Sequence, residues 1–240
     1  MRTRYLPGML LAAVLPISAS AVPVTYEYGG TFDGRFSQLP EWYDFGLPFV
    51  VDFAGTFTLE SETAPSFLSE NVVDYRDLVT DVTIRLGPAG SLGTYSGLGG
   101  TLAPYVPHAS SLYILDDILL DGSPFDQFGL QMSLPGLAAD PANLYRSLFF
   151  SGFSYTGDIV TNFPDPAALP GPEMFSQYPP QLQLSVSQYS DDGEFLRSAG
   201  LIGELTTFRP LERSVPEPAS WSLMLVGLLA LAAARRKAAD

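Results

Sequence analysis

Among the side chains that could carry chemistry, carboxylates are the most numerous in this sequence. The 240-residue chain carries 26 Asp plus Glu, a single His and no Cys. Asp116, Asp117 and Asp121 lie close together, and their oxygens suit Ca²⁺, which takes about six to eight oxygen ligands without strict geometry. Their spacing does not match the EF-hand loop, and Asp is common at turns because it hydrogen-bonds to nearby backbone. We therefore expect plain turn residues here, with a calcium site as the alternative.

The sequence lacks the side chains that nucleophilic catalysis and zinc binding usually require. His108 is the only histidine, so a Ser-His-Asp triad would depend on one residue of an expected loop. The absence of Cys removes thiol catalysis and, by count, zinc sites built from His and Cys. A glycosidase carboxylate pair is defined by a separation of about 5 to 9.5 Å in space, so the sequence leaves it open. We expect a non-enzymatic protein without a cofactor, and a secreted hydrolase is the alternative.

Alternating apolar residues dominate the middle of the chain. From Phe49 to Glu60, apolar residues, most of them aromatic or β-branched, alternate with others, which predicts a half-buried strand with Gly55 as a bulge or a close backbone approach. Alternation or a short apolar run predicts further strands at Val24–Tyr28, Thr80–Leu86, Leu112–Leu115, Phe125–Met132, Leu148–Tyr155, Leu182–Val186 and Leu201–Thr207. Between the two ends of the chain, only Asp140–Leu148 has the start of a helical pattern.

Turn residues separate these strands at short intervals. The chain has 21 Pro and 22 Gly, which favours antiparallel strands over a parallel sheet with crossover helices. Gly87–Gly100 is expected to be a glycine-rich loop, and it lacks the Gly-Lys-Ser/Thr ending of a phosphate-binding loop. Asn162–Pro180, with six prolines, is expected to cross the surface as an irregular connection. The predicted fold is all-β, an antiparallel β-sandwich or jelly-roll-like domain.

The body of the chain is strongly acidic. Residues 22–214 contain 7 Arg, no Lys and 24 Asp plus Glu, a formal charge of −17. Such a surface repels phosphate backbones and anionic membrane surfaces, so nucleic acid is not an expected partner. Solubility in a crowded matrix that contains cations explains the charge. Aromatic residues such as Trp42 and Tyr43 would serve sugar stacking, although most aromatic rings are expected in the core.

The first 21 residues have the three parts of a secretory signal peptide. Arg2 and Arg4 give the positive region, Leu6–Ile17 the apolar region, and Ala19-Ser20-Ala21 the small-residue cleavage site. We expect export through the Sec translocon and cleavage after Ala21 by signal peptidase. The mature chain would then begin at Val22. Without Cys, lipid attachment at a lipobox is excluded.

Residues 215–240 form a tail of three parts. Val215-Pro216-Glu217-Pro218 comes first, an apolar run follows at 219–234, and Arg235-Arg236-Lys237 begins the basic end. The two prolines make the first part a stiff, non-helical spacer. A helix over 219–234 would rise about 24 Å, which nearly spans a bilayer core of about 30 Å. The cations place this end in the cytoplasm and the body outside it, so we expect a single transmembrane helix.

The tail resembles the PEP-CTERM protein-sorting signal of Gram-negative bacteria from Val215 to about Lys237. The resemblance implies an exosortase that processes the chain near Pro-Glu-Pro, transient anchoring in the inner membrane, and a final place at the cell surface or outside the cell. It also implies a structural or glycan-adhesive role in exopolysaccharide or biofilm. Phe53–Thr58 is similar to an early strand of domains often found before this tail. The chain thus divides into a signal peptide (1–21), an exported domain (22–214) and a sorting signal (215–240).

Overall fold

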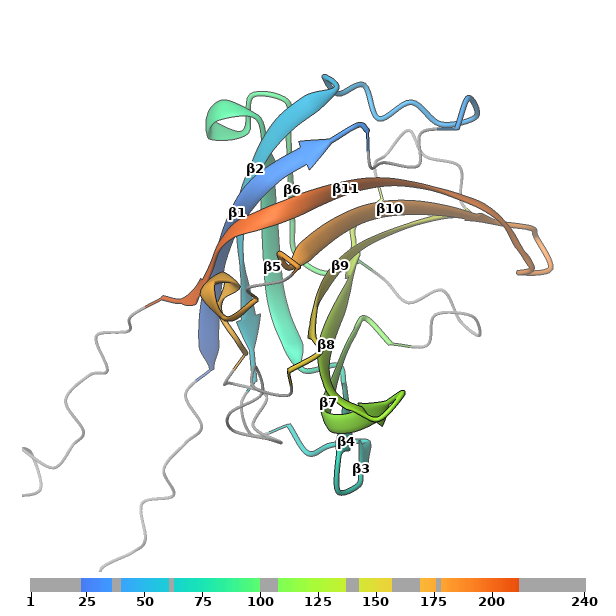
Figure 1. Cartoon of the computed structure of the whole chain (residues 1–240). Coiled ribbons are helices and arrows are strands. Elements are labelled where there is room, and N and C mark those ends of the chain that lie inside the picture. The colour runs from blue at the N-terminus through green and yellow to red at the C-terminus, as the bar shows by residue number, and fades with distance from the viewer. Residues whose placement is uncertain are drawn as a thin grey trace, which may run out of the picture.

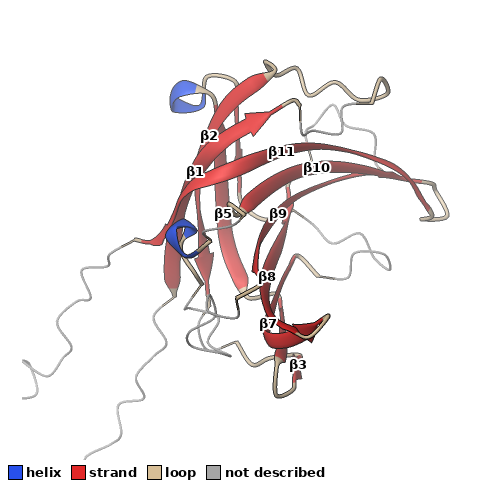
Figure 2. Ribbon diagram, viewed as in Figure 1, coloured by secondary structure: helices blue, strands red, loops and turns tan. Residues whose placement is uncertain are grey.

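The structure, a computed structural model, describes residues 23–35, 40–60, 63–99, 108–136, 143–156, 169–175 and 178–211. These residues form eleven strands and two one-turn 3₁₀ helices (Figures 1 and 2). The strands are β1 Val24–Asp33, β2 Val50–Leu59, β3 Phe67–Leu68, β4 Val72–Arg76, β5 Val79–Leu86, β6 Gly93–Ser96, β7 Ser110–Leu120, β8 Ser123–Leu134, β9 Leu144–Ser154, β10 Gln181–Tyr189 and β11 Phe195–Pro210. The helices are η1 Pro88–Gly90 and η2 Pro172–Met174.

All eleven strands belong to one sheet. Its order is β3-β4-β7-β8-β9-β10-β11-β1-β2-β5-β6, and neighbouring strands pair antiparallel throughout. The sheet bends round until β5 and β8 flank one interior (Figure 1). The antiparallel all-β prediction is confirmed, but the sandwich or jelly roll is wrong for the described residues. Strands as long as the 16 residues of β11 carry enough right-handed twist to curl one sheet around its own apolar face.

The predicted strands are all present, and most are longer than the sequence pattern indicates. Two local predictions are corrected. Leu144–Leu148, expected at the start of a helix, belongs to β9, while residues 140–142 lie outside the described ranges. The expected loop Gly87–Gly100 contains the edge strand β6, which pairs with β5.

The core lies on the concave face and is rich in aromatic rings. The rings of Tyr26 and Phe57 are nearly parallel at 5.3 Å, and Phe150 meets Tyr28 edge-on at 4.8 Å. Phe208 of β11 lies 5.8 Å from the Phe150 ring. These five side chains are almost fully buried and come from β1, β2, β9 and β11, so one cluster holds strands far apart in the sequence together.

Of the two alternatives predicted for Gly55, a bulge or a close backbone approach, the structure has the close approach. A Cβ atom there would lie 2.0 Å from the Thr83 carbonyl oxygen and 2.5 Å from the Tyr28 ring. The Tyr28 hydroxyl crosses this space and donates a hydrogen bond of 2.8 Å to Thr83 O, and burial raises the pKa of Tyr28. Pairing runs without a shift through Gly55 on both sides, so no bulge occurs there.

The described part of the proline-rich segment before β10, residues 169–175 and 178–180, does not simply cross the surface as expected. Leu169 and Phe175 are 7% and 6% exposed and belong to the core cluster. The Leu169 amide donates to the Tyr26 hydroxyl at 3.2 Å, and the Phe175 ring lies against Gly152. A curled sheet leaves interior volume between its own walls, and this segment with η2 fills part of it.

Candidate functional site

Several predicted functional residues lie outside the described ranges. They are the cleavage residues Ala19 and Ala21, the motif Val215–Pro218 and the basic cluster Arg235–Lys237. Among the described residues no helix is long and apolar enough to cross a membrane, and the expected transmembrane helix at 219–234 is not among them. The described chain begins with β1 and ends after β11, and Tyr26 near its start pairs with Pro210 near its end.

The predicted carboxylate cluster forms a bulge. Between Leu115 and Ile118 the pairing of β7 with β8 shifts, so that Asp116 and Asp117 together face Asp126. The Asp117 amide donates a 2.8 Å hydrogen bond to the Asp126 carboxylate, which belongs to a fully buried residue. Asp117 has φ 50°, a left-handed conformation that Asp adopts more readily than most residues. The buried carboxylate thus stabilises the bulge.

Asp121 lies apart from this bulge, at the tip of the β7–β8 hairpin. Asp121 and Gly122 have φ 52° and 84° and form a two-residue turn, for which Asp-Gly is a preferred pair.

At the bulge itself, burial and the charges of Asp126 and Asp117 raise the pKa of Asp116. In the part of the chain that the structure describes, no three His, Cys, Asp or Glu residues gather closely enough to share a metal ion.

His108 forms an exposed pair with Asp77. Its Nδ1 lies 2.9 Å from Asp77 Oδ2, and the Ala109 amide donates to Asp77 Oδ1 at 2.8 Å. Burial alone would raise the pKa of Asp77, but these hydrogen bonds outweigh it and lower the pKa. Ser110, the nearest buried serine in sequence, accepts the Val79 amide instead. The pair therefore joins the segment just before β7 to the link between β4 and β5.

Trp42 and Tyr43, the sequence's candidates for sugar stacking, make contacts within the domain. The Arg197 guanidinium lies 4.4 Å from the centre of the Trp42 ring. The Tyr43 hydroxyl accepts a 2.7 Å hydrogen bond from Arg146, which is 2% exposed. The loop that carries both rings is thus fixed to β9 and β11.

A different surface, on the convex side of the sheet, has the composition of a binding site. The outward residues of β7 before its bulge and of β8, β9 and β10 include no charged side chain. We call this surface the neutral face; it consists of Ser111, Tyr113, Leu115, Phe125, Gln127, Gly129, Gln131, Ser133, Tyr145, Ser147, Phe149, Ser151, Phe153, Gln181, Gln183, Ser185 and Ser187. Charges reappear on both flanks, at Glu204 of β11 and at the ion pair of Asp74 with Arg76 in β4.

Two aromatic rings form the centre of the neutral face. A Cβ atom on Gly129 would lie 2.2 Å from the Tyr113 ring, so Tyr113 lies directly over this glycine. The Phe149 ring is 6.5 Å away and tilted by only 29°, and the Gln127 amide donates to the Tyr113 hydroxyl at 3.0 Å. Burial raises the pKa of Tyr113. Two partly buried, roughly parallel rings with an amide beside them form a platform on which a sugar ring can stack.

One corner of the neutral face is covered. Ser133 Oγ donates to the carbonyl oxygens of Gly99 and Ala109 at 2.9 and 3.1 Å, so those segments lie over it. Tyr145 nearby is 8% exposed, and burial raises its pKa to about 12. The open part of the face therefore centres on Tyr113 and Phe149.

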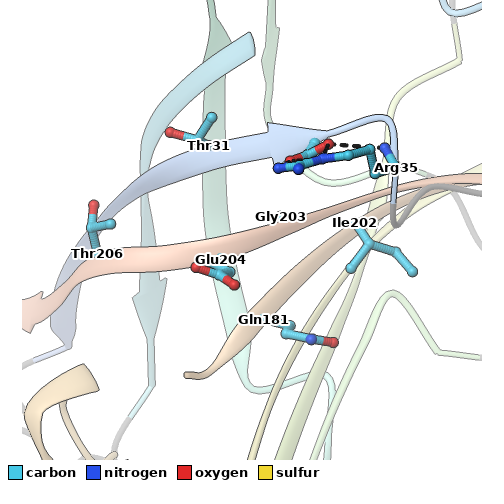
Figure 3. A pocket seen from close by; sticks show the side chains of 8 residues that line it. Thr31, Arg35, Gln181, Ile202, Gly203, Glu204 and Thr206 are labelled. Carbon is cyan, nitrogen blue, oxygen red and sulfur yellow. Dashed lines mark hydrogen bonds and ion pairs between the residues drawn. The ribbon is translucent and has the colours of Figure 1, made fainter. Parts of the chain in front are cut away.

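A cross-strand row connects these rings with a hollow in the outer surface. Tyr113 pairs with Gly129, Gly129 with Ser151, Ser151 with Gln181, Gln181 with Glu204, and Glu204 with Thr31. The row ends in a hollow of about 490 Å³, lined by Thr31, Asp33, Arg35, Gln181, Ile202, Gly203, Glu204 and Thr206 (Figure 3). An ion pair joins Arg35 to Asp33 there. The hollow adjoins the point between Gly29 and Gly30 where the pairing of β1 with β11 shifts.

Sequence reasoning missed the neutral face, although its signal is present. On the outer side of β9 and β10, at 145–153 and 181–187, every second residue is Tyr, Ser, Phe or Gln, never Asp, Glu, Lys or Arg. In a chain with a net charge of −14 this run of neutral outward positions stands out once the faces are assigned. The pairing of Tyr113 with Gly129, in contrast, needs the register of the sheet.

The comparisons with known proteins concern the tail. Residues 214–237 match the family model of the PEP-CTERM protein-sorting motif, one residue before the predicted start at Val215. No curated protein matches the chain, and no solved structure does. The matched motif supports export and exosortase-dependent sorting to the cell envelope or surface. The chain is therefore a PEP-CTERM domain-containing protein, with its sorting motif at residues 214–237.

Proposed function

We propose that this exported protein is a non-enzymatic, glycan-adhesive component of exopolysaccharide or biofilm. The observation that carries the proposal is the platform of Tyr113 and Phe149 on an uncharged, partly open sheet face. Aromatic faces present apolar surface to the C–H face of a sugar, while amides and hydroxyls meet its hydroxyl groups. A protein that is sorted to the cell surface meets such glycans there.

The sorting route completes the proposal. The signal peptide 1–21 directs the chain through the Sec translocon, and the helix at 219–234 holds it in the inner membrane with Arg235–Lys237 in the cytoplasm. Exosortase then processes the chain at Val215–Pro218. The body, which is released or attached at the surface, presents the neutral face to the surrounding polysaccharide.

The alternative is a secreted hydrolase that acts on the same polysaccharide. Its strongest support is Asp116, whose pKa is raised beside the carboxylates of Asp126 and Asp117, because a general acid needs a raised pKa. Binding is favoured because Asp126 is fully buried and accepts the bulge hydrogen bond. That engagement leaves it poorly placed to activate a water molecule.

One experiment separates the two functions. The processed protein is incubated with purified exopolysaccharide of the producing cells, and both cosedimentation and new reducing ends are measured over time. Adhesion predicts that the protein pellets with the polysaccharide while reducing ends stay at the level of a sample without protein. Reducing ends that increase with protein concentration would establish the hydrolase, and a protein that neither pellets nor cleaves would refute both proposals.

A further inference from the structure

We infer that the neutral face selects an uncharged polysaccharide, whose chain lies along the cross-strand row from Tyr113 to the hollow at Glu204 and Thr31. The inference rests on the proposed glycan-adhesive function and specifies its ligand. It depends on three features of the described surface: the distribution of charge, the groups along the row, and the length of the row.

Charge excludes the acidic class of polysaccharide. The domain has a formal charge of −17 over residues 22–214, and the neutral face is flanked by Glu204 on one side and by Asp74, paired with Arg76, on the other. The neutral face offers no cation to pair with a uronic acid or a sulfate, and Arg35 in the hollow is already paired with Asp33. The carboxylate of Glu204, opposite Gln181 in the row, repels an anionic chain within a Debye length of about 8 to 10 Å. An uncharged chain meets no such repulsion and loses no ionic hydration on binding.

The groups along the row suit sugar hydroxyls. Ser151 and Gln181 follow the Tyr113–Gly129 pair, and Gln183 of β10 lies over Gly200 with its amide nitrogen 2.9 Å from the position of an added Cβ. Hydroxyl and amide groups both donate and accept hydrogen bonds, so each can match a sugar hydroxyl in either orientation. A purely apolar partner would leave these groups without hydrogen bonds, which costs free energy.

The length of the row calls for a chain and not a single sugar. From β7 to β1 the row crosses five strand spacings of about 4.8 Å, or about 24 Å in all. A monosaccharide would cover the ring platform alone. An extended chain reaches the hollow as well, where Thr31, Thr206 and Gln181 add hydroxyl and amide groups.

The test compares uncharged and charged oligosaccharides on the full chain purified in mild detergent. Binding of cellohexaose, laminarihexaose and mannohexaose is measured by calorimetry beside an alginate hexamer. We expect at least one uncharged hexamer to bind, with a Kd that changes little between low salt and about 0.5 M NaCl, and the alginate hexamer to bind more weakly. The corresponding monosaccharide should bind more weakly than the hexamer, because it covers less of the row.

Variants locate the site. Tyr113→Ala should raise the Kd about tenfold, because a stacked sugar removes on the order of 60 Å² of ring surface from water. Tyr113→Phe retains the ring and should bind within about threefold of the parent, since only one part-buried hydrogen bond, from Gln127, is lost. Phe67→Ala, which removes an exposed ring from edge strand β3, is the matched control and should bind like the parent. Gln183→Glu provides a second probe that keeps the side-chain shape, and it should weaken binding of the uncharged hexamer.

The outcomes distinguish failure of this inference from failure of the proposed glycan-adhesive function. Equal or tighter binding of the alginate hexamer would overturn the selection of uncharged chains but preserve glycan adhesion. Parent-like binding by Tyr113→Ala and Gln183→Glu, with Phe67→Ala unchanged, would place the site elsewhere and overturn the inference. Failure of every hexamer and of the native exopolysaccharide to bind would overturn adhesion itself.

Discussion

Replacing Gly55 with alanine should destabilise the domain severely, although the change adds only one methyl group. The new Cβ would lie 2.0 Å from the Thr83 carbonyl oxygen and 2.5 Å from the Tyr28 ring. Neither neighbour can move alone. Thr83 O belongs to the β2–β5 ladder, and the Tyr28 ring is packed against Phe150 at 4.8 Å.

Two effects set the magnitude of this change. Overpacking a rigid site costs about 1 to 3 kcal/mol. Moving Tyr28 away also breaks its hydrogen bond to Thr83 O, and a buried hydroxyl without a partner costs about 1 to 3 kcal/mol more. The expected loss of unfolding free energy is therefore about 4 kcal/mol. For a domain of this size each kcal/mol shifts the Tm by about 2 to 4 °C, so the Tm should fall by about 8 to 16 °C.

Thermal and urea unfolding, followed by far-ultraviolet circular dichroism, measure this loss. Gly29→Ala is the matched control, because its Cβ would meet nothing closer than Phe53 O at 3.4 Å. Gly29→Ala should stay within about 1 kcal/mol of the parent. If Gly55→Ala and Gly29→Ala unfolded at the same temperature, the close packing at Gly55 and the reasoning built on it would be refuted.

Three further predictions follow from other sites. In a strain with an active exosortase, Glu217→Ala should accumulate as an uncleaved, membrane-bound precursor. Glu212→Ala, which lies outside the matched motif, is the control and should be processed normally. Equal gel mobility of the two variants would contradict this prediction. Asp126→Asn should lower the unfolding free energy by about 1 to 3 kcal/mol, because the bulge amide loses its carboxyl acceptor, while Asp121→Asn should retain the parent stability. Asp77 has a lowered pKa in the folded state, so its stabilisation is present above its unfolded pKa of about 4 and is lost as the pH falls through the folded value. Urea titrations should therefore separate the parent from Asp77→Asn at pH 7 and bring them together near pH 2, and a gap that persists in acid would count against this linkage.

The sequence predicts the strands of this domain better than their assembly. Alternation in Phe49–Glu60 marks which side chains face inward, and β2 follows it closely. Alternation cannot tell whether two inward faces belong to two sheets or to opposite walls of one curled sheet, because both bury the same residues. The curled form depends on pairings such as β1 with β11, whose residues Tyr26 and Pro210 are far apart in the chain.

The same difference between local patterns and long-range pairing applies to the candidate site. The tail motif is local in sequence, so Val215–Pro218 and the residues after it are recognised without a structure, and the family match supports them. The neutral face depends on register, since Tyr113 covers Gly129 only because β7 and β8 pair with Ile114 opposite Phe128. The contact of Trp42 with Arg197 also depends on the fold, because Arg197 lies 155 residues further along the chain.

The two edges of the sheet are short, and this bears on how many copies can fold side by side. β3 has two residues and β6 has four, so each described edge offers few unpaired backbone groups to a neighbouring chain. An exported protein completes its folding outside the cytoplasm, where newly translocated copies are close to one another. Long open edges would then pair between copies and form aggregates. A sheet of eleven strands that ends in such short strands can reach a high surface density while each copy remains a separate molecule.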